Sequence, residues 1–194
     1  MGRSRDVIGG VVDIFGRGIE PSVFADMKNA VGDIAGNGNI RWKANLYGPV
    51  GFLFGGREER LCEYGEEGRR LAAVLCGQID NTEELCGMMS LESESSPCGL
   101  AVSAYSLLGE GFADRIKGKF AFAVYDEEHG RLAVTLRGRG IAPIYYLLRR
   151  ERLVFSSHLE AVLAFGEPRE VCALVDGEGL VVTFGKCERV TIDP

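Results

Sequence analysis

The stretch from Gly118 to Tyr146 constrains the fold of this chain more than any other part of the sequence. Its first run, Lys119 to Tyr125, is almost wholly apolar and rich in aromatic side chains. A polar turn follows at Asp126 to Gly130, and Leu132 to Leu136 is a second β-like run. Two such runs on either side of a turn predict a β-hairpin that is buried on both faces.

Further strand-like runs follow this hairpin. Ile144 to Leu148 comes after a glycine-punctuated segment, and Arg152 to Ser156 comes after the charged tip Arg149-Arg150-Glu151. We therefore expect four consecutive strands to form an antiparallel meander. Two later runs, Glu170 to Val175 and Gly179 to Phe184, flank an Asp-Gly pair at 176 and 177, which is a strong signal for a second hairpin.

The remaining sequence predicts strands and helices in alternation, so we expect a layered α+β fold. Gly77 is expected to end a buried strand, Gly36 to Gly38 to stop the first helix, and Ser90 to Pro97 to form a polar loop. The other expected strands are 6–15, 42–46, 50–54, 60–63 and 71–76. The expected helices are 22–34, 81–89, 100–108, 112–116 and 158–165.

Length and composition bound what the protein can be. The chain has 194 residues, of which 46% are hydrophobic and 26% charged, and this is the composition of a globular protein. We expect one domain over residues 1–194. The net charge of −6 argues against a nucleic-acid partner. The pairs Arg69-Arg70 and Arg149-Arg150 are flanked by acids and are expected to be solvated turn residues. The absence of an apolar run of membrane-spanning length or a signal-peptide core predicts a cytoplasmic protein with no membrane partner.

The cysteines do not form a metal-binding pattern. There is no Cys-x-x-Cys pair, and only two histidines accompany the thiols, so we expect no metal and no cofactor. The cysteines are expected to be small buried hydrophobes in a reducing compartment, although a disulfide stays open as an alternative. They stand at positions 62, 76, 86, 98, 172 and 187.

Three motifs carry a resemblance to a known family. The segments FAFAVYDEEHGRLAV, GIAPIYY and LVFSSHLEAVLA are very similar to the second half of the class II glutamine amidotransferase domain of asparagine synthetases. The resemblance extends more weakly over nearly the whole chain. It implies an N-terminal-nucleophile-hydrolase-like αββα sandwich, in which two antiparallel sheets lie between helical layers.

The nucleophile of that family is absent from its expected position. The family opens with Cys-Gly-Ile-x-Gly-Ile-Val-Asp, and its N-terminal cysteine attacks the glutamine amide with its own α-amine as base. The matching stretch here is Asp6 to Asp13, so the place of the nucleophile falls on Asp6. Because five residues precede Asp6, we expect no free amine there. The first cysteine of the chain is Cys62.

The oxyanion-binding motif is also altered. The family motif Phe-Asn-Gly-Glu-Ile-Tyr-Asn corresponds to Leu75 to Asn81, which puts Cys76 in the place of the asparagine donor. Gly77 could still offer its N–H. Loss of one such donor typically costs about 2.7–4 kcal/mol of transition-state stabilisation. We therefore expect Cys76 to be a buried strand residue.

The resemblance implies that the groups that hold glutamine are missing as well. An arginine binds the α-carboxylate in the family, and Gly51 falls at its place. An aspartate in Ser-Asp-Thr-Glu binds the α-amine, and Pro97 falls at its place in the segment Ser96 to Gly99. Neither residue can pair with an amino-acid zwitterion.

Two arginines and the two histidines are further candidates for binding groups. Arg137 and Arg139 lie on a glycine-rich loop that could hold an anion, although a plain turn is the favoured interpretation. His158 stands where the family usually has glutamate and is expected at the surface or as a cap of a helix start. His129 is expected to be solvated in the hairpin turn.

These departures predict a glutaminase-like domain without glutaminase activity. In the family an ATP-pyrophosphatase domain makes an acyl-adenylate. The chain has no Ser-Gly-Gly-x-Asp-Ser loop, so we expect that domain to be absent and an asparagine-synthetase-like protein to be a partner. Two alternatives stay open. One is an active amidotransferase or amidohydrolase with Cys76 or Cys98 as a displaced nucleophile, and the other is a small-ligand-binding module.

Overall fold

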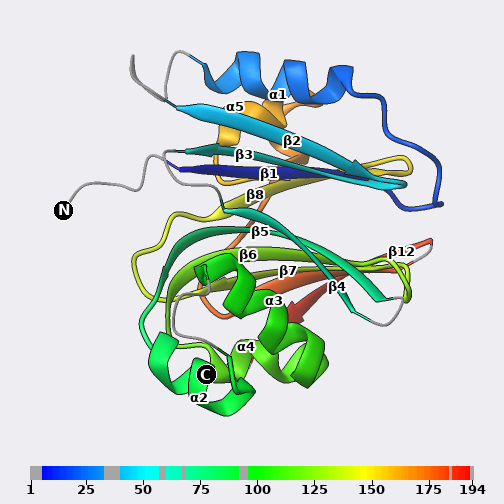
Figure 1. Cartoon of the computed structure of the whole chain (residues 1–194). Coiled ribbons are helices and arrows are strands. Elements are labelled where there is room, and N and C mark those ends of the chain that lie inside the picture. The colour runs from blue at the N-terminus through cyan, green and yellow to red at the C-terminus, as the bar shows by residue number, and fades with distance from the viewer. Residues whose placement is uncertain are drawn as a thin grey trace.

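The structure is a computed structural model that describes residues 6–32, 40–56, 60–66, 69–91, 96–183 and 185–192. Within these ranges the strands form two six-stranded sheets in which neighbouring strands are antiparallel. We name them sheet A, with the order β10-β8-β9-β1-β3-β2, and sheet B, with the order β12-β11-β7-β6-β5-β4. The two sheets are stacked face to face (Figure 1).

The strands of sheet A are β1 (Val7–Asp13), β2 (Arg41–Tyr47), β3 (Val50–Gly56), β8 (Ile144–Arg149), β9 (Arg152–Ser156) and β10 (Cys172–Leu174). The strands of sheet B are β4 (Leu61–Glu66), β5 (Arg69–Ile79), β6 (Gly118–Asp126), β7 (Arg131–Arg137), β11 (Glu178–Thr183) and β12 (Lys186–Thr191). The α-helices are α1 (Ser22–Val31), α2 (Thr82–Met89), α3 (Pro97–Leu108), α4 (Phe112–Arg115) and α5 (Leu159–Leu163). Short 3₁₀ helices lie at Gly109–Gly111 and Pro168–Glu170.

Helices cover both outer faces of this sandwich. The helices α1 and α5 lie on sheet A, and α2, α3 and α4 lie on sheet B (Figure 1). The expected α+β architecture, an αββα sandwich, is confirmed. None of the described helices has the length and hydropathy needed to cross a membrane.

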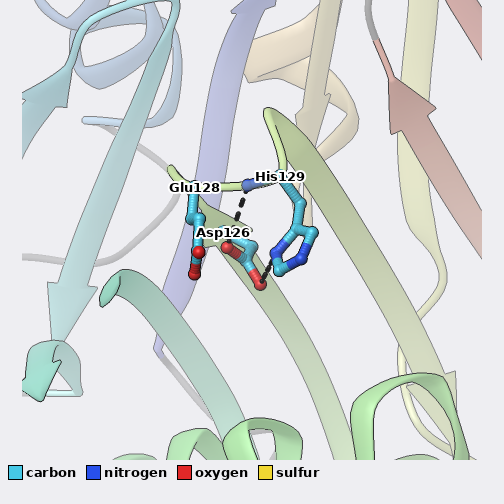
Figure 2. Close-up of side chains that lie close together, drawn as sticks. All are labelled: Asp126, Glu128 and His129. Atoms are coloured by element: carbon cyan, nitrogen blue, oxygen red, sulfur yellow. Dashed lines mark hydrogen bonds and ion pairs between the residues drawn. The ribbon is translucent and has the colours of Figure 1, made fainter. Parts of the chain in front are cut away.

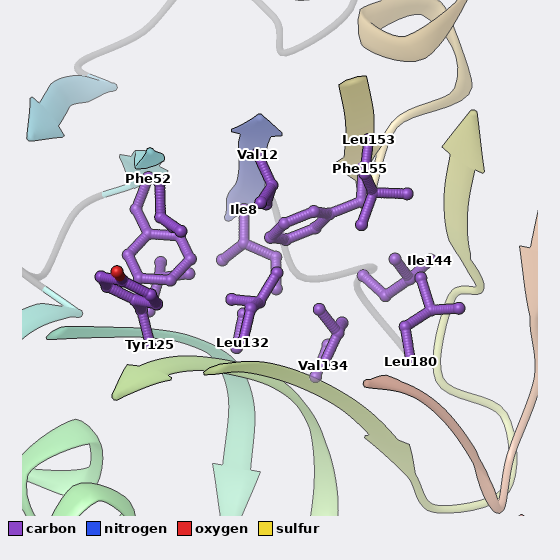
Figure 3. Close-up of a cluster of buried hydrophobic side chains, with 14 of the residues drawn as sticks. Ile8, Val12, Phe52, Tyr125, Leu132, Val134, Ile144, Leu153, Phe155 and Leu180 are labelled. Carbon is purple, nitrogen blue, oxygen red and sulfur yellow. The ribbon is translucent and has the colours of Figure 1, made fainter. Parts of the chain in front are cut away.

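The largest core lies between the sheets, because alternate side chains of each strand face inward. Phe52 of β3 and Phe155 of β9 meet there edge to face, with 6.4 Å between ring centroids. Figure 3 shows these side chains above those of sheet B. Leu53 and Val154, which are next to these two residues in the chain, instead pack under α1 and α5. This alternation fixes which residues can face the space between the sheets.

The predicted hairpin from Lys119 to Leu136 is confirmed as β6 and β7, but the four-strand meander is wrong. Strands β7 and β8 belong to different sheets, so the glycine-punctuated segment between them crosses the sandwich. Gly138 and Gly140 have φ values of +104° and +82°, which allow this change of direction. Local patterning predicts these strands but not the sheets that they join.

The second predicted hairpin is also wrong. Strand β10 pairs with β8 in sheet A, whereas β11 pairs with β7 and β12 in sheet B, so Asp176-Gly177 is a second crossing. The two crossings touch, because Gly138 donates its N–H to Oδ1 of Asp176 at 2.7 Å. Strand β12, which forms the hairpin with β11, is a strand that the sequence patterns did not predict.

Two further predictions about single residues need correction. Strand β5 does not end at Gly77, since it continues to Ile79 and pairs Gly77 with Phe120 of β6. The six cysteines are free, but the expected burial is wrong for three of them, since Cys62 and Cys187 are half-buried and Cys172 is exposed. The described residues do not include the predicted helix stop at 36–38 or residues 92–95 of the predicted polar loop.

Candidate functional site

The two sheets bring Asp6 and Cys76 together. Asp6 immediately precedes β1 in sheet A, and Cys76 is an inward-facing residue of β5 in sheet B. The thiol of Cys76 is buried and donates a hydrogen bond to the main-chain oxygen of Asp6, with 3.6 Å between the two atoms. The positions predicted for the nucleophile and for the oxyanion donor are therefore neighbours, although 70 residues separate them.

Gly77 lies next to this contact and cannot be another residue without strain. Its φ is +106°, and a Cβ added there would lie 2.1 Å from the carbonyl oxygen of Lys119. Its own carbonyl accepts a hydrogen bond from Arg60. The glycine is required by the close approach of β6 and by its left-handed conformation.

The structure does not bring Gly51 to Asp6. A Cβ at Gly51 would lie 2.5 Å from the ring of Phe24, so this position faces α1 on the outer side of sheet A. Gly56 faces the site instead, because a Cβ there would lie 2.8 Å from Oδ1 of Asp6. Sequence reasoning missed Gly56, since its place opposite Asp6 follows from the register in which Val7 pairs with Gly55.

Pro97 begins α3, and the side chain of Ser96 caps this helix by accepting from the N–H of Gly99 at 3.1 Å. Cys98 belongs to the core between α3 and sheet B, whereas Cys76 faces the other side of that sheet. The two candidate displaced nucleophiles are thus on opposite faces of β5.

The thiol of Cys98 lies 2.7 Å from that of Cys62 and 3.7 Å from the carbonyl oxygen of Ala73. The hydrogen bond with Cys62, together with burial, raises the pKa of Cys98 well above its ordinary value. A buried thiol that resists deprotonation is a poor nucleophile, because the thiolate is the reactive form.

The segment after β9 lies against the start of β1. Ser156 donates to the carbonyl oxygen of Ile8 at 2.9 Å, and Ser157 accepts from the N–H of Ile8 at 3.1 Å. His158 precedes α5, as predicted for a helix start, and its Nδ1 lies 3.2 Å from Oγ of Ser157. Burial lowers the pKa of His158, against a smaller opposite effect of Glu160. Sequence reasoning missed both serines.

Arg137 and Arg139 do not form one anion site. The guanidinium of Arg137 faces α4 on the outer side of sheet B and lies 3.6 Å from the carboxylate of Asp114. Arg139 is exposed in the crossing segment. An ion pair with Asp114 explains Arg137 without a ligand.

Asp126, Glu128 and His129 form a group of metal-ligand type in the β6–β7 turn (Figure 2). His129 is exposed, as predicted, and its Nδ1 lies 3.0 Å from Oδ2 of the buried Asp126. The same Oδ2 lies 2.6 Å from Arg69 Nη2. Because a guanidinium already occupies the one buried carboxylate, the group fits an ion-pair network better than a cation site. Arg69 is therefore not the solvated turn residue that its sequence neighbours predict.

A family model described as "Glutamine amidotransferase domain" matches residues 62–164. Asparagine synthetase [glutamine-hydrolyzing] 3 of Bacillus subtilis is 29% identical over 135 residues, which are 68% of this chain and 21% of that protein. Amidase chry2 of Gibberella zeae is 26% identical over 112 residues, 56% of this chain and 17% of that protein.

Solved structures agree with the fold. The glutamine phosphoribosylpyrophosphate amidotransferase of B. subtilis superposes with a TM-score of 0.72 at 13% identity, over 96% of this chain and 49% of that one. A glutamine aminotransferase class-II domain protein from Silicibacter pomeroyi has a TM-score of 0.50 at 13% identity and is covered over its full length.

The chain spans about a fifth of the length of the curated relatives it matches. The family match nevertheless covers more than half of the 194 residues, and it includes β5, β6 and the segment around His158. The two-sheet sandwich and this match lead to one conclusion: the chain belongs to the glutamine amidotransferase domain family, as a class II domain related to asparagine synthetases.

Proposed function

We propose that this domain has no glutaminase activity and serves as a structural or partner domain for an ATP-dependent amide-forming synthetase. The observation that carries the proposal is the contact between Asp6 and Cys76. A carboxylate side chain stands at the position of the nucleophilic thiol, and a thiol stands at the position of the oxyanion-binding amide.

Each replacement removes a chemical requirement. The Asp6 carboxylate is a much weaker nucleophile towards an amide than a thiolate, and the Cys76 S–H is a weak donor compared with an amide N–H. The missing donor alone typically costs about 2.7–4 kcal/mol of transition-state stabilisation. Gly77 retains the glycine of the motif, but packing against Lys119 and a positive φ already explain a glycine at this position.

Substrate recognition is weakened in the same way. Neither Gly51, which faces α1, nor Gly56, which faces Asp6, supplies a cation for an α-carboxylate. Pro97 supplies no carboxylate for an α-amine. Arg60, the cation that contacts Gly77, donates to the main-chain oxygen of that residue. These features support a domain in which the fold persists without glutamine chemistry.

The relatives support the choice of partner. The B. subtilis relative is named as a glutamine-hydrolysing asparagine synthetase, and the present chain matches 21% of its length. A synthetase-like protein that forms an acyl-adenylate is therefore the partner we propose. Copurification of the tagged chain with a synthetase-like protein encoded nearby is the direct test of docking, and failure to recover one would count against it.

One alternative has a specific observation in its favour. The Cys76 thiol lies at the site position next to Asp6, so it could act as a displaced nucleophile. This alternative predicts ammonia release from glutamine that stops in a Cys76→Ala variant and persists in a Cys98→Ala control. The proposal predicts no enzyme-dependent ammonia from either variant or from the unchanged chain.

A further inference from the structure

A second concave site lies on sheet A, at the end remote from Asp6. Asp13 ends β1, whereas Asp6 precedes it, and the tip of the β8–β9 hairpin is at the Asp13 end (Figure 1). A cavity of about 450 Å³ opens there. Its apolar part consists of Leu147, Val154 and Phe165. This volume is within the range of roughly 300–1,000 Å³ that is typical of small-molecule sites.

Strand register places charged residues around this apolar part. Arg152 of β9 is paired with Arg149 of β8 on one side and with Asp13 of β1 on the other. Cross-strand partners point to the same face of a sheet, and Arg152 shares the outer face with Val154, which packs under the helices. Arg149, Arg152 and Asp13 therefore surround one patch of the outer face.

Each acid at or beside the cavity already has an arginine partner, although Arg17 serves two of these acids. Arg17 pairs with Asp13 at 3.2 Å and also with Glu151. Arg149 lies 3.8 Å from Glu170 and donates to the carbonyl oxygen of Phe165 at 3.5 Å.

Two of the four arginines that line the cavity take part in none of these ion pairs. Among the described residues, Arg150 and Arg152 have no acidic partner within ion-pair distance, although both line the cavity. Like charges on directly opposed strands, as at Arg149 and Arg152, destabilise a sheet unless something compensates for them. The four arginines of the lining outnumber the three acids Asp13, Glu151 and Glu170, which leaves a small positive excess at the cavity in a chain whose net charge is −6.

We propose that this cavity is a binding site for a small organic phosphate with a flat apolar body. Arginine forks bind phosphate oxygens in a bidentate geometry, and planar guanidinium groups also stack on flat rings. Arg150 and Arg152 hold the phosphate, while Leu147, Val154 and Phe165 contact the apolar part. The site is independent of the proposed loss of glutaminase activity, because it shares no residue with the Asp6–Cys76 contact.

Calorimetric titration of the full chain with phenyl phosphate tests this site. We expect saturable binding with one site per chain. An Arg150→Gln, Arg152→Gln double variant is expected to bind at least about tenfold more weakly, since it loses the charge-assisted hydrogen bonds to the phosphate. An Arg70→Gln variant, which removes the same charge from an exposed position of β5, should bind like the unchanged chain.

Two further titrations test the contributions of the phosphate and of the ring separately. Inorganic phosphate should bind more weakly than phenyl phosphate because it leaves the apolar part uncovered, and benzoate should bind more weakly because it carries one negative charge. Retained affinity in the double variant would overturn the proposal, and so would an equal loss in Arg70→Gln. Urea midpoints, together with a single Arg150→Gln variant at the exposed turn, exclude unfolding as the cause of a loss.

Discussion

Arg69 Nη2 lies 2.6 Å from Oδ2 of Asp126, a carboxylate of which 1% is exposed. The pair joins the first residue of β5 to the last residue of β6. Arg69 also donates to the carbonyl oxygen of Ser106 at 3.0 Å, and its guanidinium lies over the ring of Tyr105. One side chain therefore ties β5 and β6, two neighbouring strands of sheet B, to α3.

Asp126→Asn is expected to lower the free energy of unfolding by about 2–3 kcal/mol, which is less than the roughly 3–5 kcal/mol of a fully buried pair because Arg69 is partly exposed. Urea unfolding followed by circular dichroism measures the change. Lys186→Gln is the matched control, because its ion pair with Glu188 is exposed on both sides and should contribute nothing measurable. Equal stability of Asp126→Asn and the unchanged chain would contradict this account.

The same pair predicts a pH dependence of stability. Burial disfavours the charged form of Asp126, but hydrogen bonds from Arg69 and His129 outweigh it and hold the pKa of this carboxyl below its usual range. A folded pKa below the unfolded value means that the stabilisation is present above about pH 3.9 and is lost as the pH falls through the folded pKa. The stability difference between the unchanged chain and Asp126→Asn should therefore shrink below about pH 4. A difference that stays constant down to pH 2 would contradict it.

Gly77→Ala is expected to destabilise the fold by about 3 kcal/mol or more. The added Cβ would meet the backbone of Lys119 at 2.1 Å, in addition to the cost of a positive φ. Gly48→Ala is the control, since Gly48 also has a positive φ but has no atom within 4 Å of the added Cβ. It should lose only about 1–2 kcal/mol. Urea unfolding of both variants tests the difference, and similar losses would mean that β6 does not approach Gly77 closely.

Thiol labelling should separate the cysteines by their surroundings. Cys172 is exposed, whereas Cys98 is buried and its pKa is raised well above the ordinary value. Iodoacetamide at pH 8, followed by peptide mass spectrometry, is expected to modify Cys172 first and Cys98 only when the domain opens. In urea the two should react at similar rates. Fast labelling of Cys98 in the folded protein would instead support a reactive thiol at that position.

His158 is expected to titrate below the ordinary histidine value of about 6.5, because burial lowers its pKa. Its contribution to stability is present above pH 6.5 and is lost as the pH falls through the folded pKa, since the unfolded chain binds the proton more readily. A proton NMR titration that compares His158 with the exposed His129 measures this directly. A midpoint for His158 above 6.5 would contradict the burial.

Sequence patterns predicted single elements well where one face or both faces are buried. Lys119 to Tyr125 is the clearest case, because a continuous apolar run between turns matches a central strand. The same patterns did not predict which strands pair, because the local sequence does not distinguish a hairpin turn from a connection between the two sheets. Both the 138–143 segment and Asp176-Gly177 have turn composition, and both connect the two sheets.

The candidate site was predicted in part for the same reason. Resemblance placed Asp6 and Cys76, and the structure brings them into contact. Gly56 could not be predicted, because its place opposite Asp6 depends on the β1–β3 register. Arg150 was interpreted as a solvated turn residue, and its role in a cavity follows only once the β8–β9 hairpin is packed beside β1.

Ammonia release from glutamine by the purified chain, measured with and without ATP and aspartate, tests the central claim most directly. The account predicts no release above the buffer rate, and also none from an Asp6→Cys variant trimmed to begin at that residue. Catalytic groups act as a unit, and Cys76 and Pro97 would still lack the amide donor and the carboxylate. Turnover of the unchanged chain in the ordinary enzyme range, roughly 1–10³ s⁻¹, would contradict the account.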